Sequence, residues 1–145
     1  MNDKPYPFSL TRAEFRYEFA SISPEKEVSK VVLITQTETQ RVFNLALLDV
    51  LENGDLSDIS VTNNKDLRTV LATVIKIIEE FLTTRKNCFI VFRGSDERRQ
   101  SLYKNVMSRE LTAISRKFQV WGGIENDIEQ FLLDREYEYY LIKMK

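Results

Sequence analysis

The sequence predicts an α+β fold: a single domain over residues 1–145, with a mostly antiparallel β-sheet and two main amphipathic helices packed on one of its faces. Three observations predict it. Apolar residues alternate with a period of two in the first half of the chain. They recur every three or four residues from Leu67 to Phe81, and a second amphipathic segment follows the apolar run Cys88–Phe92. These periods are typical of half-buried strands and of helices that bury one face.

Strands account for the first half of the predicted order. The four expected strands lie at residues 14–19, 28–37, 42–50 and 56–61. The first alternates strictly between aromatic and charged side chains, which indicates one solvated face, and the second is rich in β-branched residues. A turn at residues 23–26 separates these two, and Asn53-Gly54 is a strong hairpin signal before the fourth. An antiparallel meander is the simplest arrangement.

Helices and strands alternate in the predicted second half. The expected elements are a helix at 67–81, a strand at 88–92, a helix from Ser95 or Asp96 to about Arg116, a strand at 118–121, a further turn of helix at 126–132 and a strand at 137–145. Cys88–Phe92 is apolar on both faces, which is typical of a central strand covered on both sides. Gly122-Gly123 is expected to end the strand at 118–121. The order is therefore roughly ββββαβαβ(α)β.

Composition excludes several classes of site. The chain has no histidine, so triads and metal sites that need an imidazole are excluded. Cys88 is the only cysteine, which excludes an internal disulfide. No cofactor and no metal are expected, because the acidic residues between Asp49 and Asp58 miss the spacing of a calcium loop and fit a solvated hairpin tip. The first ten residues lack a signal peptide's apolar core, and 18 consecutive apolar residues occur nowhere, so a cytoplasmic protein without a membrane span is expected.

Charge is distributed unevenly along the chain. Residues 81–117 hold nine basic and three acidic side chains, or +6, whereas residues 44–80 carry −4 and residues 118–145 carry −3. The formal net charge of −1 is therefore a cancellation. The second predicted helix forms a basic stripe, which suits nucleic acid or an acidic protein partner. A solvated helix face explains the same pattern.

A candidate anion site lies where the apolar strand leads into the second helix. The candidate residues are Arg93, Gly94, Ser95, Arg98, Arg99, Tyr103, Lys104 and Arg109. Backbone N–H groups at a helix N-terminus and arginine forks suit phosphate oxygens, and a glycine lets a ligand approach. Asp96 and Glu97 would repel an anion there, and the pattern of a phosphate-binding loop is not met. The alternative is that Gly94 makes the turn, Ser95 caps the helix and the arginines are solvated.

The tyrosines near the C-terminus have two interpretations. Tyr137, Tyr139 and Tyr140 occur together with the basic residues Arg135, Lys143 and Lys145. Such a strand can stack nucleic-acid bases, as in proteins that bind single strands. Aromatic residues are also favoured in ordinary packed strands. An exposed tyrosine strand at the sheet edge would allow a homodimer.

Several short motifs, spread over the chain, together resemble those of a known protein family. They are Tyr6-Pro-Phe8, Phe43-Asn44-Leu45-Ala46-Leu47-x-Asp49, Asn53-Gly54-Asp55, Val70-Leu71-Ala72-Thr73-Val74, Arg93-Gly94-Ser95, Arg99-x-x-Leu102-Tyr103, Phe118-x-Val120-x-Gly122 and the segment 137–145. In this order they resemble a family of uncharacterised bacterial proteins of about this length, a domain of unknown function. The resemblance implies a stand-alone domain of the bacterial cytoplasm, and it brings no known activity, cofactor or catalytic residue. It draws attention to Gly94, Ser95, Arg99 and Tyr103.

The leading functional hypothesis is a non-enzymatic binding or protein-interaction module, since no catalytic residue is marked out. One alternative is a nucleic-acid binder that contacts phosphates with basic residues of the second helix, namely Arg93, Arg98, Arg99, Lys104 and Arg109. A second alternative is an enzyme that acts on a phosphate-containing small molecule at the turn from Gly94 to Arg99.

Overall fold

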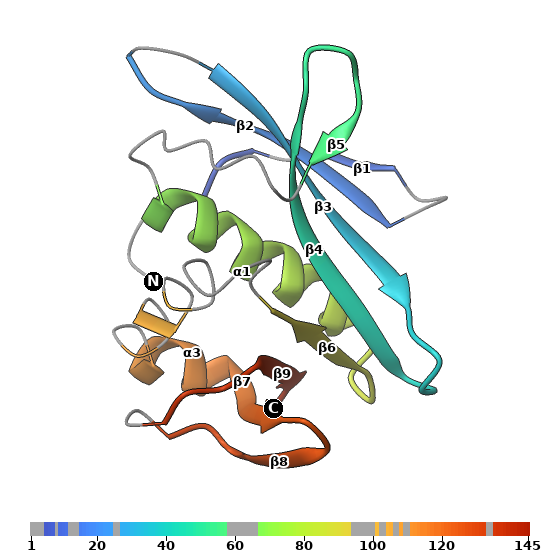
Figure 1. Cartoon of the computed structure of the whole chain (residues 1–145), viewed down its shortest axis with the longest axis vertical. Helices are drawn as coiled ribbons and strands as arrows, with labels where there is room; N and C mark the ends of the chain where they lie inside the picture. The colour runs from blue at the N-terminus through green and yellow to red at the C-terminus, as the bar shows by residue number, and fades with distance from the viewer. Residues whose placement is uncertain are drawn as a thin grey trace. The chain divides into compact units, whose positions relative to one another are not determined.

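A computed structural model describes residues 5–7, 9–11, 15–24, 27–57, 67–93, 101, 104–105, 108, 111–132 and 135–145. It has the predicted α+β fold, with a mostly antiparallel sheet and helices (Figure 1). The elements are β1 (Ser9–Thr11), β2 (Arg16–Ile22), β3 (Glu27–Gln36), β4 (Val42–Val50), β5 (Leu56–Ser57), α1 (Leu67–Thr83), β6 (Phe89–Phe92), α3 (Leu111–Lys117), β7 (Phe118–Ile124), β8 (Asp127–Gln130) and β9 (Tyr139–Met144).

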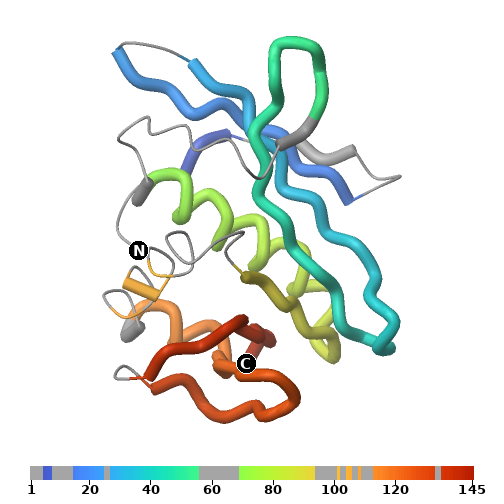
Figure 2. The backbone as a smooth tube through the Cα atoms, in the orientation of Figure 1, coloured from blue at the N-terminus to red at the C-terminus, as the bar shows by residue number. Residues whose placement is uncertain are grey.

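The chain forms two compact units. Figure 2 traces the backbone from the N-terminus to the C-terminus. The N-terminal unit comprises described parts of residues 2–35 and 45–80, and the C-terminal unit comprises those of residues 36–44 and 81–145. Strands β3 and β4 and helix α1 contribute residues to both. The single domain over residues 1–145 stays a prediction.

Neighbouring strands of the N-terminal unit follow the order β1-β2-β3-β4, with β5 paired to β4. The pairs β1–β2, β2–β3 and β4–β5 are antiparallel, as the meander prediction requires. Tyr17 and Phe19 are buried while Glu18 is exposed, so the alternation seen in the sequence separates a core face from a solvent face. Gly54 has a φ of 88° in the turn before β5, a conformation that glycine adopts without strain.

Helix α1 supplies much of the apolar core of the N-terminal unit. Its buried side chains up to residue 80 are Val70, Leu71, Ala72, Val74, Ile77 and Ile78. Thr73 is fully buried among them, and its Oγ1 accepts a hydrogen bond of 2.9 Å from the backbone N–H of Tyr6. The Tyr6 ring also stacks on Phe19 with 6.1 Å between centroids. These contacts join the segment at residues 5–7 to both α1 and β2.

The C-terminal unit has the strand order β4-β6-β9-β7-β8. The pair β4–β6 is parallel, and the pairs β6–β9, β7–β9 and β7–β8 are antiparallel. The predicted central position of the Cys88–Phe92 strand is therefore confirmed. Its predicted coverage on both sides is wrong, because Ile90 is buried while Phe89 and Val91 are only half-buried.

Gly122 and Gly123 lie inside β7 rather than at its end, so the prediction that they close the strand is wrong. The physical reason is aromatic packing on both sides of the strand. A Cβ on Gly122 would clash with the ring of Tyr137, and a Cβ on Gly123 would clash with the ring of Tyr139. The two glycines therefore make room for two tyrosines instead of breaking the strand.

The predicted turn of helix at residues 126–132 is also wrong, because residues 127–130 form strand β8. Glu125 adopts a φ of 53° in a two-residue turn that brings Asp127 opposite Ile124. Pairing with β7 thus overrides the helix-like spacing of the apolar residues in this short segment.

Two further expectations concern the ends of this region. Strand β9 lies between β6 and β7, so the tyrosine-bearing strand is not at the sheet edge, and the homodimer loses that support and stays a prediction. In the predicted second helix, Ser101, Lys104, Asn105 and Ser108 are helical and α3 continues to Lys117, while the start of the helix lies outside the described residues. Within the described part of the chain, no helix is long and apolar enough to cross a membrane.

Candidate functional site

The sheet of the C-terminal unit has one buried face and one half-exposed face. Side chains of adjacent residues in a strand point to opposite sides, and residues paired across strands share a side. The buried side carries Ile90, Phe118, Val120, Tyr140 and Ile142, each at most 8% exposed. The C-terminal turn of α1 contacts this side, since the Phe81 ring meets the Phe43 ring edge-on at 5.0 Å.

The opposite side gathers aromatic and basic side chains from three strands. Phe89 of β6 is paired with Lys143 of β9, and Tyr139 of β9 is paired with Gly123 of β7, two residues after Trp121. These registers place the four side chains on one side of the sheet. Arg93 follows the end of β6 and lies over Tyr139. We call Phe89, Arg93, Trp121, Tyr139 and Lys143 the aromatic face.

Contacts within the aromatic face hold its members in place. The Phe89 and Trp121 ring centroids are 5.8 Å apart, and Lys143 Nζ lies 5.4 Å from the Phe89 centroid. Arg93 Cζ lies 5.5 Å from the centroid of Tyr139. The Tyr139 hydroxyl donates a 2.8 Å hydrogen bond to the carbonyl of Glu125, which fixes the ring over Gly123. Cations over aromatic rings are attracted by the ring quadrupole, so the rings orient the two basic side chains.

The described strand residues on this side of the sheet carry no negative charge. Arg93 is exposed and the four other members of the aromatic face are half-buried. Among the described residues, the other side chains at paired positions on this side of β6, β7, β8 and β9 are Val91, Gln119, Ile128, Gln130 and Leu141, of which none is acidic. The carboxylates of Glu125 and Glu138 are exposed next to the Tyr139 end. The strand positions thus combine three rings with the cation Lys143 and no carboxylate, and Arg93 adds a second cation just after β6.

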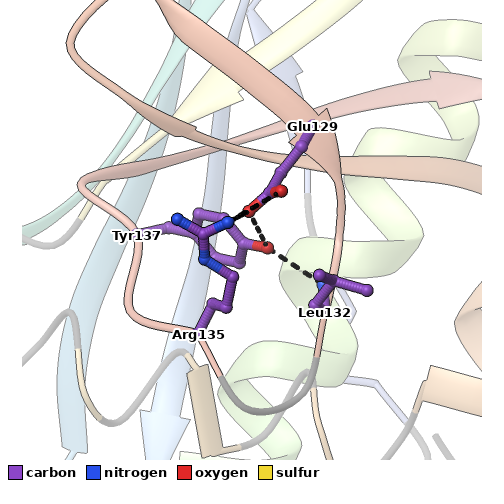
Figure 3. Close-up of polar contacts among 4 residues, drawn as sticks. All are labelled: Glu129, Leu132, Arg135 and Tyr137. Carbon is purple, nitrogen blue, oxygen red and sulfur yellow. Dashed lines mark hydrogen bonds and ion pairs between the residues drawn. The ribbon is translucent and has the colours of Figure 1, made fainter.

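A cluster of polar contacts lies near the C-terminal end of β8 (Figure 3). The Tyr137 hydroxyl donates to Glu129 Oε1 at 3.0 Å and accepts from the backbone N–H of Leu132 at 3.0 Å. Arg135 pairs with the same carboxylate at 2.9 Å. This network connects β8 to the segment that precedes β9. We interpret it as structural, because the Tyr137 hydroxyl donates to one protein group and accepts from another.

Tyr137 and Tyr140 are core residues, at 5% and 0% exposure. Burial raises the pKa of Tyr137, and the nearby Glu129 raises it further. Burial also raises the pKa of Tyr140 to about 12, with Glu136 adding to the shift. The interpretation of all three C-terminal tyrosines as a base-stacking strand is therefore wrong for these two. Tyr139 alone of the three lies on the half-exposed side.

The structure describes two of the eight predicted anion-site residues. Arg93 is exposed, whereas Lys104 donates to Glu136 Oε1 at 2.5 Å and its side chain is only 17% exposed. The ammonium of Lys104 is therefore already matched by a carboxylate. The predicted site residues Gly94, Ser95, Arg98, Arg99, Tyr103 and Arg109 lie outside the described residues.

The predicted solvated acidic tip is wrong for Asp49. Lys30 Nζ lies 2.5 Å from Asp49 Oδ1, and both side chains are at least nine-tenths buried. Asn53 and Asp55 do lie exposed in the turn and hydrogen-bond to each other at 3.0 Å. Across the described ranges, no group of three or more acidic or cysteine side chains is placed to hold a metal ion.

Phe89 and Trp121 are members of the aromatic face that sequence reasoning did not single out. The apolar run at Cys88–Phe92 hides Phe89, because its neighbours on both sides of the strand are apolar too. Trp121 carries a usable signal, since it shares its side of β7 with the polar Gln119. The contacts of Arg93 with Tyr139 and of Lys143 with Phe89 become visible only when the strand register is known.

Comparison with known proteins adds a family and no activity. The model of a family of unknown function, DUF6934, matches residues 2–145. No curated protein matches the chain. No solved structure matches it either.

Proposed function

The chain belongs to DUF6934, a family of unknown function, and we propose that this protein is a non-enzymatic binding module that holds an anionic partner on its aromatic face. The observation that carries the proposal is the position of Arg93. The residue is exposed just after the central strand β6, and its guanidinium lies over the ring of Tyr139. An arginine oriented on an aromatic ring keeps its planar fork of donors available for carboxylate or phosphate oxygens.

Lys143 supplies a second positive charge on the same side of the sheet. Its ammonium lies 5.4 Å from the Phe89 ring, and no acidic side chain is paired with it across β6 or β7, where its neighbours are Phe89 and Gln119. Two cations on one rigid sheet act together on a polyanion. A binding role agrees with the charge distribution, since β6 lies in the basic part of the sequence.

A binding role is favoured over catalysis by the chemistry of the surrounding groups. The chain has no histidine, and two carboxylates of the C-terminal unit, Glu129 and Glu136, are engaged in ion pairs with Arg135 and Lys104. These two carboxylates are therefore already engaged with cations of the protein. Binding through the basic second helix and an enzyme site at the turn from Gly94 to Arg99 both stay predictions, since they depend largely on residues that the structure does not describe.

Heparin tests the proposal, because it is a polyanion without aromatic bases. Fluorescein-labelled heparin is titrated with the protein at about 50 mM salt and followed by anisotropy, and binding is expected to weaken steeply as salt rises. The double variant Arg93→Gln with Lys143→Gln is expected to lose most of this affinity, since both substitutions remove charge and keep much of the side-chain length.

A matched control removes two charges from the same unit at another place. Lys86 and Arg116 are both exposed. The variant Lys86→Gln with Arg116→Gln has the same net charge as the first double variant, so equal losses in the two variants would show that only total charge matters and would overturn the proposal. Absence of heparin binding by the unaltered protein at about 50 mM salt would overturn it as well.

A further inference from the structure

We infer that the anionic partner of the aromatic face is a single-stranded nucleic acid, whose bases stack on the half-buried rings of Phe89, Trp121 and Tyr139 while Arg93 and Lys143 contact its phosphates. The inference rests on the proposed function and names its partner. It starts from the composition of the face, in which three aromatic rings and Lys143 lie on adjacent strands and Arg93 follows the end of β6. This combination of stacking rings and a positive surface is the general requirement for holding a single strand.

The rings are spaced along the sheet in successive rows. Phe89 and Lys143 form one paired row, Trp121 and Leu141 form the next, and Tyr139 and Gly123 form the third. Rows on one side of a strand are two residues apart, which is roughly 6.7 Å. Each of the three rows therefore offers one ring, and the rings come from β6, β7 and β9 in turn. Successive bases of an extended strand meet one platform after another in such an arrangement.

The cations mark the two ends of this series. Lys143 is in the row of Phe89, and Arg93 lies over Tyr139 in the third row. A backbone that follows the rings therefore meets a positive charge at each end of the aromatic face. Arg93 adds a second mode of contact, since bases also stack on the plane of a guanidinium.

An acidic protein partner would account for the two cations of the aromatic face but not for its three rings. Half-buried Phe89, Trp121 and Tyr139 keep part of their apolar surface in water, and carboxylates would not cover it. A duplex explains the face no better, because its bases are stacked within the helix and cannot reach a flat sheet. Single-stranded nucleic acid matches both components, and the polar neighbours Gln119 and Gln130 on the same side are compatible with base edges.

Trp121 is the only tryptophan of the chain, so its fluorescence reports directly on this face. The probe is a 12-residue oligothymidylate, compared with an abasic oligomer of equal length and charge. We expect the oligothymidylate to quench the Trp121 emission and to bind roughly ten-fold or more tightly than the abasic oligomer, since each stacked base adds to affinity. Heparin is expected to bind without comparable quenching.

Variants separate stacking from charge. Trp121→Leu and Tyr139→Leu remove a ring but keep an apolar side chain, and each is expected to weaken oligothymidylate binding by roughly ten-fold while heparin binding stays within two-fold. Phe43→Leu is the matched control, because Phe43 is an aromatic residue of the same unit that packs against Phe81 on the other side of the sheet. Circular dichroism of each variant establishes that the fold is retained, and anisotropy of labelled oligomer replaces fluorescence where Trp121 is absent.

Each outcome decides between the two proposals. If heparin binds through Arg93 and Lys143 but the oligothymidylate and the abasic oligomer bind equally, the single-strand inference is wrong and the proposed function stands. If polyglutamate binds more tightly than the oligothymidylate, the partner is an acidic protein and the inference is wrong. If neither heparin nor oligomer binds, the proposed function fails together with the inference.

Discussion

Lys30 Nζ lies 2.5 Å from Asp49 Oδ1, with the two side chains only 9% and 7% exposed. Lys30 is on β3 and Asp49 is on the neighbouring strand β4. The second carboxylate oxygen of Asp49 is buried without a hydrogen-bond partner among the described residues. Each charge is therefore held in the interior of the N-terminal unit by the other, which makes the pair sensitive to the loss of either member.

The first prediction is that Asp49→Leu or Lys30→Met destabilises the protein by about 3–5 kcal/mol, because either substitution leaves a buried charge without its partner. The double variant Lys30→Met with Asp49→Leu is expected to cost much less than the sum, since both charges are then absent. Urea unfolding followed by circular dichroism gives the four free energies of a double-mutant cycle.

The exposed pair of Arg16 and Glu18 is the control for this cycle. Its atoms are 2.7 Å apart, but the side chains are 27% and 47% exposed. Arg16→Gln is therefore expected to cost less than about 1 kcal/mol. Additive effects of Lys30→Met and Asp49→Leu would contradict the coupling that the buried pair implies.

The second prediction concerns the two glycines inside β7. Gly122→Ala is expected to destabilise the protein by about 1–3 kcal/mol, because the new methyl group meets the base of the Tyr137 ring, which is fixed in the core. Gly123→Ala is expected to cost less, since it meets the far end of the half-buried Tyr139 side chain, which shifts at the cost of one hydrogen bond to the Glu125 carbonyl. Thermal unfolding of the two variants ranks them, and an equal loss or the reverse order would count against this packing.

The third prediction is a loss of stability at alkaline pH that depends on Tyr140. Its pKa is raised to about 12 in the folded protein, against about 10 for an unperturbed tyrosine. Below pH 10 the ring is neutral in both states and its contribution to stability is complete. As the pH rises from about 10 to about 12, the unfolded state releases its proton first, so unfolding becomes more favourable.

Tyr140→Phe removes this titration and also removes a buried hydroxyl that has no hydrogen-bond partner in the described part of the chain. The variant is expected to be at least as stable as the unaltered protein at pH 8 and to lose less stability between about pH 10 and 11.5. Guanidinium unfolding at a series of pH values measures both effects. Identical pH slopes for the two proteins would show that other groups, such as Tyr137, account for the alkaline loss.

Much of the fold follows from local patterns. The alternation around Tyr17 and Phe19 predicts β2, the helical spacing from Leu67 predicts α1, and the turn at Asn53-Gly54 predicts the β4–β5 hairpin. Each of these signals is carried by neighbours in sequence, so it is visible without the tertiary structure. Segment 126–132 differs, because its short apolar spacing is compatible with a helix and only pairing with β7 makes it a strand.

The candidate site was predictable only in part. Arg93 and Lys143 stand out in the sequence as basic residues in or beside strands. The rings that they contact, those of Tyr139 and Phe89, are distant from them in the chain. The registers β6–β9 and β7–β9 bring them together. Tyr137, Tyr139 and Tyr140 look equivalent in the sequence, whereas the structure buries two and leaves the third half-exposed.

The sequence by itself determined the α+β class, the absence of histidine chemistry and the basic segment concealed by a net charge of −1. Those properties depend on composition and on periods of two to four residues, which any single segment carries. The tertiary structure alone decided that the glycines sit under tyrosine rings, that Asp49 is buried against Lys30, and that the aromatic face exists. These depend on strand order and register, which set the side of the sheet that a residue occupies and the distant residue that lies next to it.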